Sequence, residues 1–428
     1  MISDLWGMST RGGAMGFLRA LFRTNRLAAE APTVVPLPYH RKSLAEHLDP
    51  EGPKRILALD GGGVRGAMEI AILQRIEDLL RARHGNHPDF RLADYFDLIG
   101  GTSTGSIIAA GLAAKRMTVS EIWDLYQEMA GKVFKRRFLA RGAIRARFDA
   151  GNLHRQLDNV FGELELGSQE FATGFAAVAK RIDTVSPWVL HNNPRSPYFE
   201  DPEHGGYLGN RRYRLTQIVR ASAAAPMYFD PERIEIGPGQ FGEFIDGGLT
   251  PHNNPAFQLL MLAGLKNHSY GWTLNARNLL MISIGTGSLI DKTPKRPGLL
   301  SGTSAARALN ALTSMISSSE AFIELLMQWA SNAPDPLVLN SEIGDLREDL
   351  IADKPLLSYQ RYQSQLTRAY LVSELGFGFS DRDIKTLRDM TDPKAMPLAH
   401  AVGAAMARRY VRDTHFPVSF DLNVEANR

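Results

Sequence analysis

The sequence contains no cysteine, so disulfide bonds and thiolate metal sites are excluded and a reducing compartment is permitted. It also lacks an uninterrupted apolar run of about 18 residues, so we expect no membrane-spanning helix. The first residues lack the basic start, the apolar run and the cleavage site of a signal peptide. Lys and Arg number 49 against 46 Asp and Glu, a balance that argues against binding a nucleic acid polymer. These absences predict a cytoplasmic protein.

Residues 1–52 are predicted to form an N-terminal arm and a linker. Two groups of side chains in this arm can occupy separate helical faces, one apolar and one basic: Phe17, Leu18, Leu21 and Phe22, and Arg19, Arg23 and Arg26. That composition is typical of a helix lying in a lipid headgroup layer, and it predicts peripheral association at the inner membrane face. An arm packed on its own protein is the alternative.

Strands and helices alternate in the rest of the 428-residue chain, whose 44% hydrophobic residues can bury a large core. Apolar runs predict strands that each precede a helical pattern, in the order 55–60, 66–85, 95–101 and 106–115. This order predicts an α/β fold with a mainly parallel sheet. Further strands are expected at 175–182, 242–246 and 278–285. We assign residues 53–290 to a catalytic domain and 291–428 to a helical C-terminal cap.

The first predicted strand runs directly into a glycine loop, "DGGGVRG" (60–66). Gly61, Gly63 and Gly66 fit the dinucleotide-binding pattern, which also needs an acidic residue about 20 positions later at the end of the next strand. The acids near that distance, Glu77 and Asp78, lie inside the predicted helix instead. We therefore interpret the amides of Gly61, Gly62 and Gly63 as an oxyanion hole and expect no cofactor. Each well-placed donor of this kind contributes roughly 3–4 kcal/mol of transition-state stabilisation.

The second predicted strand ends in "GTSTG" (101–105), a G-x-S-x-G pattern at a strand-to-helix turn. In this context the pattern is typical of a nucleophile elbow, in which the turn exposes Ser103 Oγ at the amino end of a helix. Ser103 is therefore the candidate nucleophile, and a helix-capping serine is the alternative.

The candidate base is a carboxylate. The histidines after Ser103 lie in helical or loop-like surroundings, whereas Asp246 ends the predicted strand 242–246 on the same edge of the sheet. A partly desolvated carboxylate can take the serine proton, so the sequence predicts a Ser103–Asp246 dyad. His252 is the competing base, and a plain Asp-Gly turn is the other interpretation of Asp246.

Together, "DGGGVRG", "GTSTG" and "DGG" (246–248) resemble the patatin-like phospholipase family. "RASAAAPMYF" (220–229), "DGGLTPHNNP" (246–255) and "SIGTG" (283–287) are secondary similarities. The resemblance implies a three-layer α/β/α hydrolase that cleaves acyl esters of glycerophospholipids with Ser103 and Asp246, with the oxyanion on Gly61–Gly63 and without a metal. It also makes Arg65 and Thr102 candidate substrate-binding residues. Arg65 would bind a lipid phosphate or pair with a carboxylate.

The region after residue 300 is similar to bacterial patatin-like effectors of cyclic-nucleotide-triggered antiphage defence, so a cyclic nucleotide is a candidate activator. The segment 131–150 has seven Lys or Arg and several interleaved aromatics, and it suits an anionic lipid or activator. A solvated helix face is the alternative. Two other functions stay open: an activator-gated or membrane-docking effector whose hydrolase site is silent, and a nicotinamide enzyme. The oligomeric state is not predicted.

Overall fold

The computed structural model describes residues 39–133, 150–226, 228–266, 270–289 and 304–422. The expected N-terminal helix and most of the basic segment 131–150 lie outside these residues. Within them, no helix is both long enough and apolar enough to cross a membrane.

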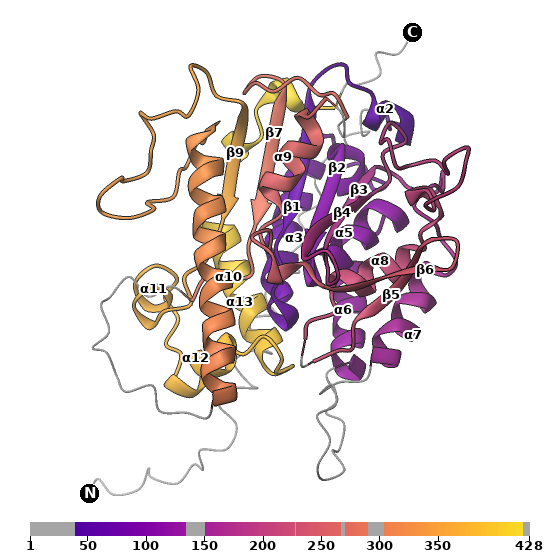
Figure 1. Ribbon diagram of the computed structural model, residues 1–428. Coiled ribbons are helices and arrows are strands. Elements are labelled where there is room, and N and C mark those ends of the chain that lie inside the picture. Colours follow the sequence, from indigo (N-terminus) through magenta and orange to yellow (C-terminus); the bar gives the residue numbers. More distant parts are fainter. Residues whose placement is uncertain (1–38, 134–149, 227, 267–269, 290–303, 423–428) are drawn as a thin grey trace, which may run out of the picture. The chain divides into compact units, whose positions relative to one another are not determined.

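The described residues form one twisted sheet at the centre of the fold (Figure 1). Its strand order is β5-β6-β3-β2-β1-β7-β9-β8, and β4 also pairs with β3. The strands are β1 (Lys54–Leu59), β2 (Leu98–Thr102), β3 (Gly174–Arg181), β4 (Ser186–His191), β5 (Glu232–Gly237), β6 (Gln240–Asp246), β7 (Leu279–Ile284), β8 (Ser331–Asn332) and β9 (Leu357–Tyr362). From β3 to β8 all neighbours are parallel, whereas β4, β5 and β6 pair antiparallel.

Helices cover both faces of this sheet. They are α2 (Leu44–Leu48), α3 (Gly66–Arg83), α4 (Leu92–Tyr95), α5 (Thr104–Lys115), α6 (Val119–Val133), α7 (Ala150–Phe161), α8 (Leu215–Ser222), α9 (Ala256–Gly264), α10 (Ser304–Trp329), α11 (Arg368–Ser373), α12 (Asp381–Arg388) and α13 (Ala395–Tyr410). Alternate residues of β1 enter two separate cores: Leu57 and Leu59 pack with α3, α5 and α13, and Ile56 and Ala58 with α9 and α10. A strand buried on both faces needs the continuous apolar run seen in the sequence. The predicted three-layer α/β/α architecture is confirmed.

The C-terminal segment differs from the purely helical expectation. Its helices α10 to α13 are present, but β8 and β9 extend the sheet beyond β7, and α13 packs against α3. The strand β9 carries Gln360 and Arg361 among its buried residues, so its sequence lacks the apolar run that identified the other strands. The C-terminal segment therefore shares the core of the preceding domain.

The ends of β2 and β6 meet along one strand. Thr102 at the end of β2 pairs with Val178 of β3, and Asp246 at the end of β6 pairs with the next residue, Ala179. Because β6 runs antiparallel to β3 while β2 runs parallel to it, the two carboxyl ends point at each other. This arrangement brings the residue after β2, Ser103, beside Asp246.

Candidate active site

The turn between β2 and α5 holds Ser103 in a strained conformation. Its φ is +53° and its ψ is −120°, and such a backbone costs about 1–3 kcal/mol in a residue with a side chain. Glycine is needed on both sides, because a Cβ on Gly101 would lie 2.2 Å from the Gly105 backbone and one on Gly105 would lie 2.3 Å from Leu59 O. The Ser103 amide donates to Ser222 Oγ at the end of α8 over 2.9 Å. These contacts fix the direction of the Ser103 hydroxyl.

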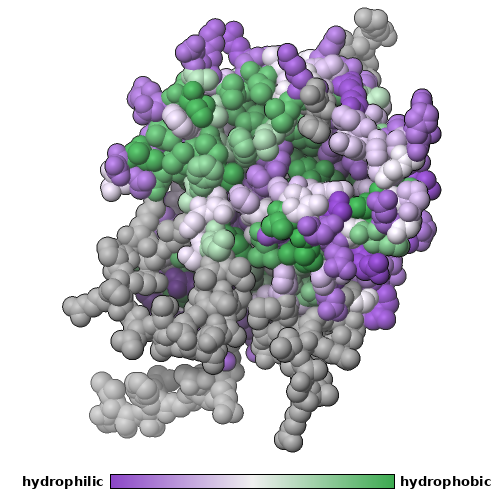
Figure 2. Space-filling model, in the orientation of Figure 1, coloured by the Kyte–Doolittle hydropathy of each residue, from purple (hydrophilic) through white to green (hydrophobic). Residues whose placement is uncertain are grey.

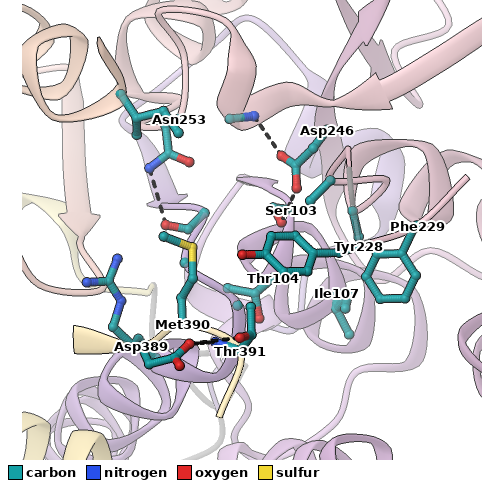
Figure 3. A pocket seen from close by; sticks show the side chains of 18 of the residues that line it. Ser103, Thr104, Ile107, Tyr228, Phe229, Asp246, Asn253, Asp389, Met390 and Thr391 are labelled. Carbon is teal, nitrogen blue, oxygen red and sulfur yellow. Dashed lines mark hydrogen bonds between the residues drawn. The ribbon is translucent and has the colours of Figure 1, made fainter. Parts of the chain in front are cut away.

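The Ser103 hydroxyl donates to Asp246 Oδ2 over 2.6 Å (Figure 3). The other carboxylate oxygen, Oδ1, accepts from Gly248 N–H at 2.7 Å, so the carboxyl group is held at both ends. Burial raises the pKa of Asp246 to about 6, while the bonds from Ser103 and Gly248 and the nearby Arg220 charge oppose that rise. A carboxylate in this environment is ionised at neutral pH and more basic than an ordinary aspartate.

The other candidate base and Thr102 have structural contacts instead. The Ser103 hydroxyl donates its hydrogen bond to Asp246 and not to His252. The backbone carbonyl oxygen of His252 accepts a hydrogen bond from Thr102 Oγ1 at 2.8 Å. Thr102 is fully buried, and it is not among the residues that line the neighbouring cavity. The Thr102 hydroxyl is therefore used within the fold, and the expectation that Thr102 binds substrate stays a prediction. Among the described residues, no group of three or more His, Asp or Glu side chains is placed to hold a metal ion.

The glycine loop presents two amides rather than three. Gly61 N–H donates to Asn253 O at 3.1 Å and is not available to a substrate, contrary to the expectation for Gly61–Gly63. Its carbonyl oxygen accepts from Asn253 Nδ2 at 3.2 Å and from Thr286 Oγ1 at 2.9 Å. The carbonyl oxygen of Gly62 accepts from Arg65 N–H at 3.2 Å.

These anchored carbonyls determine where the next amides point. In a planar trans peptide the C=O and the following N–H point in opposite directions. Fixing the carbonyls of Gly61 and Gly62 therefore aims Gly62 N–H and Gly63 N–H away from their anchors, and neither amide has an acceptor in the described part of the chain. Both glycines line the same cavity as Ser103, and a Cβ on Gly61 would lie 3.2 Å from Ser103 Cβ.

A cavity of about 360 Å³ opens beside Ser103 and Asp246. Most of its wall is apolar and comes from α5, α6, α7, the segment after α8, and the segment that follows β7: Ile107, Met129, Ala130, Val133, Leu153, Pro226, Phe229 and Leu289. Figure 3 shows Ile107, Tyr228 and Phe229 gathered on one side of Ser103, with Asp389, Met390 and Thr391 on another. The cavity therefore has an apolar side and a polar side.

Arg65 belongs to the polar side. It is 6% exposed and lines the cavity, and its Nε and Nη1 have no hydrogen-bond partner among the described residues. Burial lowers its pKa, and the carboxyl groups of Glu320 and Asp389 oppose this shift. No carboxylate of the described residues lies within 4.0 Å of its guanidinium. Arg65 was expected either to bind a lipid phosphate or to pair with a carboxylate, and the described residues show no such direct ion pair.

The comparison with protein families settles the kind of domain. Residues 57–260 match the family model of patatin-like phospholipases. The chain contains a patatin-like phospholipase domain. This match begins within β1, covers the glycine loop, the Ser103 turn and Asp246, and ends in α9.

The chain is also similar to curated proteins. It is 32% identical over 226 residues to the cGAMP-activated phospholipase of Vibrio cholerae, covering 50% of this chain and 58% of that protein. It is 28% identical over 236 residues to the cGAMP-activated phospholipase of Escherichia coli, covering 54% and 62%. It is 30% identical over 255 residues to Patatin-15 of Solanum tuberosum, covering 56% and 62%. The match thus spans about three fifths of the length of these relatives.

Several residues that hold the site in place were not predicted from the sequence. Asn253, Thr286 and Ser222 hold the glycine loop and the Ser103 turn. Their signal was present, because all three lie in the segments of secondary similarity, "DGGLTPHNNP", "SIGTG" and "RASAAAPMYF". Met390 had no such signal, because its contact with the glycine loop is made by a backbone atom from a distant part of the chain.

Proposed function

We propose that this chain is a serine lipid acyl hydrolase that cleaves fatty-acyl esters of glycerophospholipids. The observation that carries the proposal is the 2.6 Å bond from Ser103 Oγ to Asp246, beside two glycine amides that have no acceptor among the described residues and lie in the wall of an apolar cavity. The patatin-like phospholipase domain supports the reaction class. The names of the relatives support a phospholipid as the substrate.

The first half of the reaction forms an acyl-enzyme. Ser103 Oγ attacks the ester carbonyl carbon and its proton passes to Asp246 Oδ2. The carbonyl oxygen becomes negatively charged and accepts hydrogen bonds from Gly62 N–H and Gly63 N–H. The tetrahedral intermediate then collapses, the bond to the alcohol oxygen breaks, and the leaving lysophospholipid takes the proton from Asp246.

The second half reverses these roles. A water molecule attacks the acyl-Ser103 ester and gives its proton to Asp246. The same two amides stabilise the second oxyanion, the bond to Ser103 Oγ breaks, and Ser103 regains the proton from Asp246. The raised pKa of Asp246, about 6, suits a group that must both accept and return a proton near neutral pH.

The substrate is oriented by the two sides of the cavity. The apolar side, with Ile107, Val133 and Phe229, would receive the acyl chain. The unpaired Nε and Nη1 of Arg65 would bind the phosphate of the headgroup, because a guanidinium forms strong charge-assisted bonds to phosphate oxygens.

Exposed apolar side chains support action at a lipid surface. Ile316 of α10 lines the cavity, while Met315 and Phe322 of the same helix are 66% and 56% exposed. Figure 2 shows hydrophobic residues gathered over one face of the molecule, and the segment after α10 adds exposed Val338, Leu350 and Ile351. Such a patch can insert into the interface from which a lipid enters.

The test compares the protein with its Ser103→Ala variant on phosphatidylcholine vesicles. We expect fatty-acid release from the wild-type protein and its loss in Ser103→Ala, together with loss of labelling by a fluorophosphonate probe. The matched control is Ser186→Ala, which removes an exposed hydroxyl on β4 and should leave both signals unchanged. Full release by Ser103→Ala would disprove the proposed nucleophile.

An activator-gated effector is the second candidate function. It is favoured by the relatives of Vibrio cholerae and Escherichia coli, both named cGAMP-activated phospholipases. The same vesicle assay with and without cGAMP separates the two. Release only in its presence supports gating, and equal release without it supports a constitutive enzyme.

A further inference from the structure

The segment after residue 300, outside the matched residues 57–260, makes two contacts with the glycine loop and a third with Asn253, which in turn bonds the loop. We propose that this C-terminal segment positions the oxyanion amides of Gly62 and Gly63, so that it is part of the catalytic machinery rather than an appended cap. The inference rests on the proposed function of the same site. It assigns positioning roles to Glu320 and to the loop 389–391.

The first contact comes from the loop 389–391, between α12 and α13. Met390 O accepts from Val64 N–H at 2.9 Å. The fit is close, because a Cβ on Gly63 would lie 2.2 Å from Met390 O, and Gly63 has φ +56°. The carbonyl oxygen of Gly63 accepts from the Tyr126 hydroxyl on α6. The Gly63–Val64 peptide is therefore held from both sides.

The loop 389–391 is itself held in shape by a local turn. Asp389 Oδ1 accepts from Thr391 N–H at 2.9 Å and from Thr391 Oγ1 at 2.7 Å (Figure 3). Just before it, Arg388 Nε donates to Leu366 O at 2.8 Å, so the loop is also tied to the segment after β9. The position of Met390 O thus depends on the Asp389 carboxylate.

The second contact runs through Asn253. Glu320 of α10 accepts a hydrogen bond from Asn253 Nδ2, and the same nitrogen donates to Gly61 O over 3.2 Å. Gly61 N–H returns a bond to Asn253 O at 3.1 Å. Because Gly61 O and Gly62 N–H belong to one peptide, Glu320 fixes through Asn253 the direction of an oxyanion donor.

The third contact holds the start of the loop. Arg361 of β9 donates to both carboxylate oxygens of Asp60, over 2.8 Å and 2.6 Å. Asp60 is fully buried and directly precedes Gly61. Preorganised donors stabilise an oxyanion because they need no rearrangement during the reaction, so these three anchors together favour a fixed loop.

Two pairs of variants test the positioning roles. Asp389→Ala removes the acceptor of the turn, and Asp389→Asn keeps an oxygen there. Glu320→Ala removes the acceptor of Asn253, and Glu320→Gln keeps one. Asp381→Ala is the control, because this exposed carboxylate at the start of α12 pairs only with Arg368 among the described residues. The readouts are kcat and KM on phosphatidylcholine vesicles, the rate of fluorophosphonate labelling of Ser103, and the unfolding midpoint.

We expect both alanine variants to lower kcat and the labelling rate about 10-fold to 100-fold, and to change KM less than about threefold. The effect should be smaller than the loss of a whole oxyanion donor, which lowers kcat about 10²-fold to 10³-fold. The Asn and Gln variants should recover most of the rate. A kcat within twofold of the wild type in both alanine variants would overturn the inference, and so would a rise in KM alone, which indicates only a wall of the cavity. If Asp389→Ala does not fold, Thr391→Val, which removes one bond of the turn, should lower kcat in the same direction. A wild-type protein without labelling or release, both with and without cGAMP, would instead overturn the proposed function.

Discussion

Replacing Asp246 by asparagine separates the chemistry of this carboxylate from its place in the fold. The amide oxygen can still accept from Gly248 N–H, which now bonds Oδ1 at 2.7 Å, so the turn after β6 should persist. The amide nitrogen takes the position of Oδ2, 2.6 Å from Ser103 Oγ, and it cannot accept a proton. The variant therefore removes the base and preserves the packing.

The size of the effect follows from the proposed role of Asp246 as a general base. A positioned base contributes 10²–10⁴ in rate, or about 2.7–5.4 kcal/mol of the activation free energy at 1.36 kcal/mol per factor of ten. We expect kcat to fall by about 10³ in Asp246→Asn, with little change in KM because the cavity wall is preserved. The unfolding midpoint should stay near that of the wild type.

The assay is initial-rate fatty-acid release from phosphatidylcholine vesicles, with active sites counted by mass spectrometry of the labelled protein. Asp183→Asn is the matched control, because that carboxylate is exposed in the β3–β4 hairpin and pairs with Arg181. The control should retain wild-type kcat. If Asp246→Asn kept more than about a tenth of the wild-type kcat, the base would be another group and the reasoning from the 2.6 Å contact would fail.

Two further outcomes are expected. Because Asp246 must be deprotonated to accept the serine proton and its pKa is raised to about 6, kcat/KM should fall about tenfold per pH unit below pH 6 and level off above it. A profile that stays flat from pH 7 to pH 4.5, measured on a non-ionisable ester, would contradict this. Arg361→Met leaves the buried Asp60 carboxylate unpaired, so the free energy of unfolding should fall by about 3–5 kcal/mol in urea denaturation. Arg412→Met, which removes a largely exposed pair with Asp335, should cost less than about 1 kcal/mol, and an equal loss in both variants would refute the argument.

The sequence predicted the central layer of the fold because those strands are buried on both faces. A strand such as β1 must then be apolar at consecutive positions, and Ile56, Leu57, Ala58 and Leu59 supply that pattern directly. Strand β9 was missed for the opposite reason. Arg361 in this strand is buried because it pairs with Asp60, which lies 301 positions away in the sequence. The residues next to Arg361 in the sequence therefore do not indicate that it is buried.

The same distinction applies to the candidate site. Ser103 and Asp246 could be found because the turn that exposes one and the strand that ends at the other leave glycine patterns in the sequence. The unavailability of Gly61 N–H could not be found, because it depends on where Asn253 lies in space. Likewise, the sequence around Thr102 does not show that its hydroxyl donates a hydrogen bond to the carbonyl oxygen of His252. Motifs indicate which residues are present, and hydrogen-bond partners decide which of them are free to act.

The carboxyl ends of β2 and β6 face each other along β3, and this arrangement has a consequence for which insertions and deletions the molecule tolerates. The ends of the strands that lead to Ser103 and Asp246 pair with two adjacent positions of a single strand, Val178 and Ala179. Under the proposed function, loops bordering the cavity can therefore change in length, and so admit different lipids, while Ser103 stays beside Asp246. Inserting one residue between Val178 and Ala179 should instead move Ser103 away from Asp246 and leave the residues that line the cavity unchanged.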